Sequence, residues 1–75
     1  MDAKDFIEKF AEAIEADVQK ITVDTKFRSL EEWSSLAVLS VIAMLDDEYD
    51  ILIEGGDFRQ LETIKDIIRF IEGHK

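Results

Sequence analysis

Residues 31–40 read EEWSSLAVLS, and they decide the fold because two serines directly precede a long apolar run. Serine is among the best residues for capping a helix N-terminus, so Ser34 and Ser35 predict that a helix begins here. The run continues as LAVLSVIAMLDDEY, which predicts that the helix ends near Tyr49 and Asp50. At helical spacing, its core stripe is expected at Val38, Ile42, Leu45 and Tyr49.

The same helix carries apolar residues on a second stripe, at Leu36, Leu39 and Ala43, beside the serines. A helix at the edge of a small bundle is normally polar on its outer side. Two interpretations follow: the helix is buried on most sides, or this patch docks onto another protein.

Helices are also predicted on both sides of this stretch. Asp2 can cap a helix over residues 3–16, whose apolar residues recur at the spacing of one helical face. Thr63 and Asp66 have the spacing of a reciprocal capping box, so a last helix is expected to open at Thr63 and to close at Gly73.

The connecting segments are expected to be ordered but mostly irregular. Ile21, Val23 and Phe27 should pin the loop over residues 17–30, and Ser29 and Glu32 have capping-box spacing for a short turn before Trp33. A brief helix capped by Asp57 is expected over residues 58–61. The fold class is therefore all-α, a small bundle of three main helices and one short helix in a single domain spanning residues 1–75.

Composition excludes several classes of protein. The 75 residues are 47% apolar and contain no cysteine and no proline, which excludes disorder, disulfides and thiolate metal sites. The longest apolar run, residues 36–45, is about half of what a membrane-spanning helix needs, so no membrane insertion is expected. The N-terminal residues do not have a secretory profile, which predicts a cytosolic protein.

The net charge of −9 lies almost entirely in residues 29–58, which contain no lysine or arginine. The eight acids there are Glu31, Glu32, Asp46, Asp47, Glu48, Asp50, Glu54 and Asp57. Such a surface repels nucleic acid and favours partners with basic surfaces, although acidity that serves only solubility is the alternative.

The sequence offers no catalytic machinery. Its single histidine, His74, is penultimate and is interpreted as a tail residue, so no serine has an internal base and the protein is not expected to be an enzyme. The acids from Asp46 onward resemble a calcium loop, but Ile51 stands where that loop requires glycine, so no metal site is expected. What remains is the serine pair, since a helix N-terminus also favours an attached phosphate.

From the first helix to Ile71, the chain resembles the acyl carrier proteins. The family hallmark is Asp-Ser-Leu at the start of the second helix, matched here by Ser34, Ser35 and Leu36. The match continues through DDEY, an apolar connector, an acidic turn with Asp57, and Thr63, Ile64 and Asp66 at the start of the final helix.

The resemblance implies that Ser35 is esterified with 4′-phosphopantetheine, which a separate phosphopantetheinyl transferase takes from coenzyme A. It implies partners that process acyl groups through basic docking surfaces, in fatty-acid, polyketide or related pathways, and a monomeric carrier. Docking would use Leu36, Leu39 and Ala43 for apolar contact, and Asp46, Asp47 and Glu48 for charge. The family can also shelter an acyl chain; the candidate lining residues, interpreted here as ordinary core, are Val38, Ile42, Leu45, Ile53, Phe58 and Leu61.

This sequence departs from the family at Ser34, which stands where aspartate is usual. As a helix cap the exchange is nearly neutral, because both side chains accept hydrogen bonds from first-turn N–H groups. It does remove a negative charge beside the attachment site. The alternative hypothesis is therefore an unmodified helical bundle that acts as an acidic interaction module.

Overall fold

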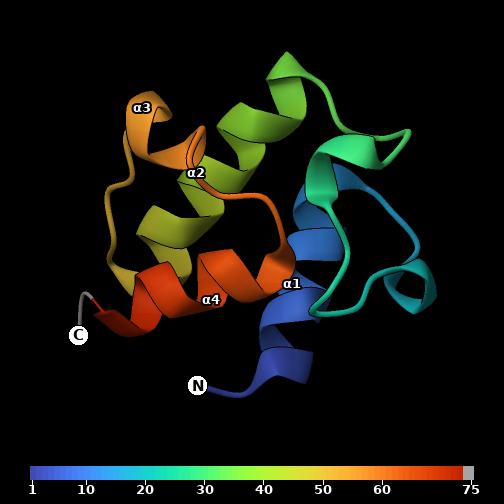
Figure 1. Ribbon diagram of the computed structural model, residues 1–75, viewed down its shortest axis with the longest axis horizontal. Coiled ribbons are helices and arrows are strands. Elements are labelled where there is room, and N and C mark those ends of the chain that lie inside the picture. Colours follow the sequence, from blue (N-terminus) through green and yellow to red (C-terminus); the bar gives the residue numbers. More distant parts are fainter. Residues whose placement is uncertain (74–75) are drawn as a thin grey trace.

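The computed structural model describes residues 1–73 and contains no strand in that range (Figure 1). Its elements are α1 (Ala3–Ile14), the 3₁₀ turns η1 (Val18–Lys20) and η2 (Phe27–Ser29), α2 (Ser35–Tyr49), α3 (Gly55–Phe58) and α4 (Ile64–Gly73). The predicted all-α bundle of three main helices and one short helix is confirmed. The interpretation of His74 lies outside the described residues.

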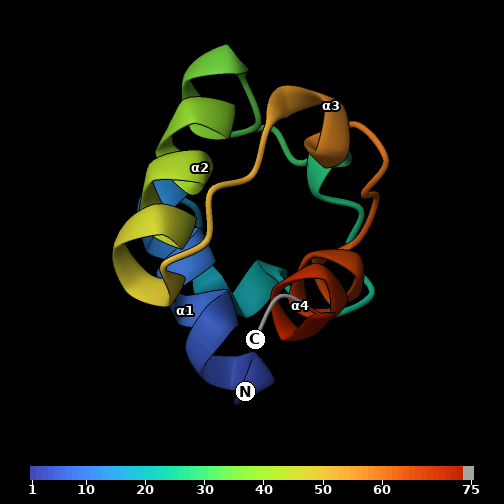
Figure 2. The same ribbon diagram turned by 90° about the vertical axis from the view of Figure 1, so that its left-hand side faces the viewer.

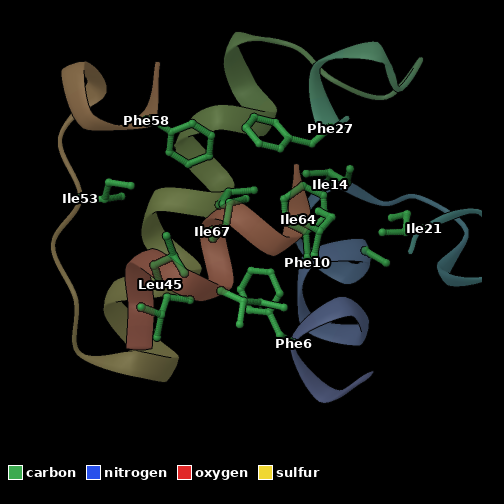
Figure 3. Close-up of a cluster of buried hydrophobic side chains, with 14 of the residues drawn as sticks. Phe6, Phe10, Ile14, Ile21, Phe27, Leu45, Ile53, Phe58, Ile64 and Ile67 are labelled. Carbon is green, nitrogen blue, oxygen red and sulfur yellow. The ribbon is translucent and has the colours of Figure 1, made fainter. Parts of the chain in front are cut away.

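The helices surround one apolar core. Figure 2 shows α1 and α2 on one side of the molecule and α3 and α4 on the other. The largest fully buried side chains are Phe6, Phe10, Phe27, Val41, Leu45, Ile53, Ile64, Ile67 and Ile71, many of which are drawn in Figure 3. No polar or charged residue is buried among residues 1–73, so the core is closed by apolar contact alone.

The first helix begins as predicted and ends two residues early. The Asp2 carboxylate accepts a hydrogen bond from the Lys4 N–H at 3.0 Å, which makes Asp2 the N-cap. At the other end Glu15 adopts the left-handed conformation, with φ 58°, and its N–H donates to the carbonyls of Ala11 and Glu12. This turn ends the helix at Ile14, because a left-handed residue cannot continue a right-handed helix.

The predicted capping box of the last helix is present. The Asp66 N–H donates to Thr63 Oγ1 at 3.2 Å, and Asp66 Oδ2 accepts from the N–H groups of Thr63 and Glu62 at 3.1 and 3.0 Å. These backbone hydrogen bonds, that from Thr63 first, hold the pKa of Asp66 below its usual value of 3.8.

Asp66→Asn is expected to flatten the acid limb of the stability curve. Because folding lowers the pKa of Asp66, its contribution is present above the unfolded-state value of about 3.8 and is lost as the pH falls through the folded-state value. Urea unfolding at a series of pH values should therefore show the variant less stable near neutrality and approaching wild type in acid. Asp24→Asn is the matched control, since the Asp24 carboxylate accepts no hydrogen bond in the described part of the chain. A constant gap between Asp66→Asn and wild type at every pH would contradict the assignment.

The loop before α2 is ordered, as predicted, and it covers the start of α4. Ile21 and Phe27 are buried, and Val23 packs against the core. The Thr25 carbonyl accepts a hydrogen bond from the Ile64 N–H at 3.2 Å, and the Val23 carbonyl accepts one from the Lys65 N–H at 2.9 Å. The first two N–H groups of α4 therefore have backbone partners in this loop.

Two details of these connecting segments were predicted wrongly. Ser29 does not cap a turn with Glu32, because it ends η2 and its hydroxyl donates to the Lys26 carbonyl at 2.7 Å. The short helix α3 begins at Gly55, three residues before the predicted start, and its N-cap is Glu54 without a side-chain cap bond. Asp57 thus lies in the first turn of α3, where the helix dipole interacts favourably with a carboxylate.

The core stripe of α2 was also predicted wrongly in part. The buried residues are Ala37, Val41 and Leu45, whereas Val38 and Ile42 are only half-buried. The helix packs against α1 on one side, and the connector that follows it, with Ile51 and Ile53 buried, runs beside it on the other, so its most buried line lies between the two (Figure 2).

Candidate functional site

Ser34 is the N-cap of α2 and its side chain is engaged in that role. Its backbone is extended, with φ −154° and ψ 175°, and its hydroxyl oxygen accepts a hydrogen bond from the Ala37 N–H at 3.1 Å. Its carbonyl accepts one from the Val38 N–H at 3.0 Å. The predicted cap is confirmed.

Ser35 is the first residue of α2 and is exposed. Within residues 1–73 its hydroxyl makes no hydrogen bond, and the N–H groups of Ser35 and Leu36 have no acceptor. These N–H groups form the positive end of the helix dipole, so a phosphodiester on the Ser35 oxygen is favoured by this environment. The two adjacent serines therefore differ: one is committed to the cap and the other is free to bear a group.

Trp33 fixes the position of this helix start. Its ring stacks on Phe10 of α1 and on Phe58 of α3, with centroid distances of 6.1 and 5.8 Å, and lies 4.9 Å from the ring of Phe27. Aromatic contacts of this kind each stabilise by about 0.5–1.5 kcal/mol beyond the burial of their area. The residue directly before the cap is thereby attached to α1, η2 and α3 at once. We call these four rings, of Phe10, Phe27, Trp33 and Phe58, the aromatic cluster.

Arg28 supports the aromatic cluster from outside, and the sequence analysis did not single it out. Its guanidinium donates to the carbonyls of Leu61 and Phe58, at 2.6 and 2.8 Å, and lies 5.0 Å from the Phe27 ring centroid. It thus joins η2 to the end of α3. The only signal in the sequence was its position, because Arg28 is the last basic residue before thirty residues that contain no lysine or arginine. That pattern does not indicate which carbonyl groups the guanidinium contacts.

The outer face of α2 presents the predicted mixture of apolar and acidic side chains. Leu36 is 73% exposed and Leu39 is 63% exposed, and Ala43 is exposed as well. Asp46, Asp47 and Glu48 are exposed at the other end of the helix. The interpretation that α2 is buried on most sides is therefore wrong, and the apolar stripe beside the serines lies in solvent. We refer to these six residues as the α2 face.

The surroundings of Ser35 contain no machinery for nucleophilic catalysis. The described residues include no histidine that could serve as its base, and no group of three or more metal-ligating side chains occurs among them. No helix in residues 1–73 is long and apolar enough to cross a membrane. Among the described residues, Ser35 thus has neither a histidine base nor a metal site beside its hydroxyl.

Comparison with known proteins identifies the family. The family model for the phosphopantetheine attachment site matches residues 4–71 of this chain. The chain belongs to the acyl carrier protein family. An acyl carrier protein from an Exiguobacterium species is 35% identical over 68 residues, which cover 91% of this chain and 86% of the relative.

Two further acyl carrier proteins support the assignment. That of Exiguobacterium sibiricum is 31% identical over 68 residues, covering 91% of this chain and 86% of the relative. That of Streptococcus thermophilus is 34% identical over 65 residues, covering 87% of this chain and 84% of the relative. Acyl carrier proteins are carriers and not enzymes, and their cofactor is phosphopantetheine.

Proposed function

We propose that this acyl carrier protein bears 4′-phosphopantetheine on Ser35 and carries acyl intermediates as thioesters for fatty-acid, polyketide or related biosynthesis. The observation that carries the attachment is the difference between the two serines. The hydroxyl oxygen of Ser34 accepts a hydrogen bond from the Ala37 N–H. Ser35 is exposed at the first position of α2, where the N–H groups of Ser35 and Leu36 have no acceptor within residues 1–73. The cytosolic location and the monomeric state remain predictions.

When bound, the phosphopantetheine group supplies the thiol that forms the thioester. The chain itself contributes three things: an accessible hydroxyl, a helix terminus that favours the phosphodiester, and a fixed start of α2 held by Trp33. Incubation with coenzyme A, magnesium and a phosphopantetheinyl transferase tests the proposal. Intact mass should increase by one phosphopantetheine group, and peptide mass spectrometry should place it on Ser35. A transferase that is active on a known carrier but adds nothing here would overturn the proposal.

We propose further that the α2 face docks the transferase and the acyl-processing enzymes through their basic surfaces. Leu36 and Leu39 are apolar and mostly exposed, and they lie beside the attachment residue. The acids at the far end of α2 steer a positively charged partner toward this contact, which raises the association rate more than the final affinity. Such a contact forms quickly and releases quickly, as a carrier that visits several enzymes requires.

Replacing Asp46 and Asp47 together by lysine is expected to slow arm transfer by roughly tenfold at low salt, because steered association depends on complementary charge. The loss should shrink as salt is added, since exposed charges are screened. Initial rates of transfer at several salt concentrations measure this. The control is Glu8→Lys with Asp24→Lys, an equal change of net charge at exposed positions away from α2. Equal losses in both variants would show that only net charge matters and would contradict docking at the α2 face.

A further inference from the structure

Ser35 shares one line along α2 with two apolar residues. Val38 and Ile42 follow it three and seven positions later, which places all three side chains on the same side of the helix. Both are half-buried, and Ile42 packs against the core. Ser40 and Met44, by contrast, line a hollow together with residues of α1. The line that carries Ser35, which we call the Ser35 edge, therefore faces away from α1, toward α3 and the connector that follows α2 (Figure 2).

The segment beside the Ser35 edge is anchored in the core by the buried side chains of Ile53 and Phe58 (Figure 3). The Phe58 ring is in edge contact with Phe27, with centroids 5.4 Å apart, and it stacks on Trp33, with centroids 5.8 Å apart. Only 3% of Phe58 is exposed. Because protein interiors are closely packed, a chain that entered the core along this edge would have to move the Phe58 ring out of the aromatic cluster.

Arg28 and the backbone next to it oppose that movement. The guanidinium donates to the Phe58 carbonyl at 2.8 Å and to the Leu61 carbonyl at 2.6 Å. Hydrogen bonds from a charged donor are roughly twice as strong as those between neutral groups. One residue earlier, the Phe27 N–H donates to the Glu62 carbonyl at 3.2 Å. These hydrogen bonds join η2 to the end of α3 and to the segment after it, so separating α3 from α2 would break them together with the ring contacts.

The hollows on the opposite side of α2 are open but carry charged side chains. The smaller hollow, near the start of the helix, is lined in part by Glu15 and Glu32. The larger hollow is lined in part by Lys9, Glu12 and Asp47. An alkyl chain that lay there would displace water from charged groups without offering them a hydrogen bond, which is unfavourable. A long acyl chain therefore finds the apolar side of α2 closed and the open side charged.

We propose that acyl groups on this carrier stay in solvent outside its core, and that its cargo is short or polar rather than a long alkyl chain. This inference rests on the proposed attachment at Ser35. The cost of leaving an alkyl chain in water grows with every methylene group, so an unsheltered long chain is a poor cargo, whereas an acetyl or a hydroxylated acyl group loses little. The aromatic cluster and Arg28 then determine the specificity of the carrier, because they hold α3 against α2.

The test loads the protein from acetyl-, octanoyl- and dodecanoyl-coenzyme A with a transferase that accepts acylated substrates, and intact mass shows which groups are attached. On a hydrophobic-interaction column, retention should rise from the acetyl to the dodecanoyl form, because an unsheltered chain reaches the resin. The backbone amide shifts of Ile42, Ile53 and Phe58 should be the same in all three forms. Equal retention of the three forms, or shifts at Ile53 and Phe58 that depend on chain length, would overturn the inference while leaving the attachment intact. A protein that takes no arm contradicts the proposed function and this inference together.

Two matched truncations of buried rings add a second measurement. Phe58→Ala opens the Ser35 edge, whereas Phe6→Ala removes a fully buried ring of α1 that lies outside the aromatic cluster. Phe58→Ala should lower the retention of the octanoyl form toward that of the acetyl form and shift the Ile53 amide signal between the two forms, and Phe6→Ala should do neither. Circular dichroism shows whether the variants are folded, and Phe58→Leu replaces Phe58→Ala if the latter is not. Retention that is the same in the Phe58 variant and in wild type would contradict the closure of this edge by Phe58.

Discussion

Ser35→Ala is expected to abolish transfer of phosphopantetheine, whereas Ser34→Ala leaves one group attached. The acceptor oxygen for the arm is lost in the first variant, and no neighbouring hydroxyl can replace it, because Ser34 points its oxygen back to the Ala37 N–H. In the second variant only the cap is lost. Intact mass after incubation with coenzyme A and transferase measures both outcomes. Two adjacent, chemically identical side chains thereby serve as each other's control.

The cap variant needs a check on stability before the comparison is made. Replacing an N-cap serine by alanine costs about 1 kcal/mol, and an acyl carrier protein of this size has a modest total stability. Thermal unfolding followed by circular dichroism gives the temperature at which both variants remain folded, and transfer is measured there. An arm that survives Ser35→Ala, or that is lost only in Ser34→Ala, contradicts the assignment.

The alternative of an unmodified acidic module is separated from the carrier by Ser34→Asp. The cap bond to Ala37 is kept, because aspartate accepts the same hydrogen bond, while a negative charge is restored beside Ser35. If Ser35 can be modified, the rate of transfer is expected to rise, because the carboxylate introduced at position 34 attracts the basic surface of the transferase. If the protein has lost its modification, neither wild type nor variant takes the arm.

Phe27→Ala has the largest expected effect on stability. The ring is fully buried and contacts Phe10, Trp33 and Phe58, with centroid distances of 6.3, 4.9 and 5.4 Å. Removing a buried phenylalanine ring costs about 3–5 kcal/mol, from the lost burial and the cavity left behind. Domains have only about 5–15 kcal/mol in total, so a large part of the stability is lost. Urea unfolding monitored by circular dichroism and by Trp33 fluorescence measures the change.

Leu52→Ala is the control for this prediction. Leu52 is 76% exposed although both of its neighbours are buried, so its truncation should change stability by no more than about 0.5 kcal/mol. If Phe27→Ala is too unstable to study, Phe27→Leu retains part of the apolar volume and should fall between the two. A loss below about 1 kcal/mol for Phe27→Ala would show that the aromatic cluster does not hold the start of α2.

The main helices could be predicted because the signals that start them are local. Asp2, Ser34 and Thr63 each lie at a boundary where the side chain reaches a backbone N–H two or three residues on, and no distant contact is needed. The end of α2 was likewise predicted correctly. The boundaries of α3 were not, because this short helix is anchored by a buried Phe58 and by carbonyl contacts from Arg28, thirty residues earlier in the chain.

The site was predictable to a similar extent. The serine pair, the acids and the exposed leucines follow from the order of residues along one helix, and the structure places them together on α2. The core stripe was missed at Val41 because α2 has neighbours on both sides, which periodicity within one helix cannot show. Hollows between α1 and α2 could not be predicted for the same reason, since Ala13 and Ser40 line them from different helices.

The covered start of α4 has a consequence for how anions approach the molecule. At α4, the carbonyls of Val23 and Thr25 accept hydrogen bonds from first-turn N–H groups. At α2, the N–H groups of Ser35 and Leu36 have no acceptor within residues 1–73. At physiological ionic strength the Debye length is roughly 8 Å, so the net charge of −9 is screened at greater distances. At shorter distances, the acids around the start of α2 repel a free polyanion such as coenzyme A. The attractive field of a helix end acts only within about one turn. On the proposed attachment at Ser35, we therefore expect an anion to reach this residue efficiently only when a basic partner has neutralised the surrounding acids, so that loading depends on contact with the transferase.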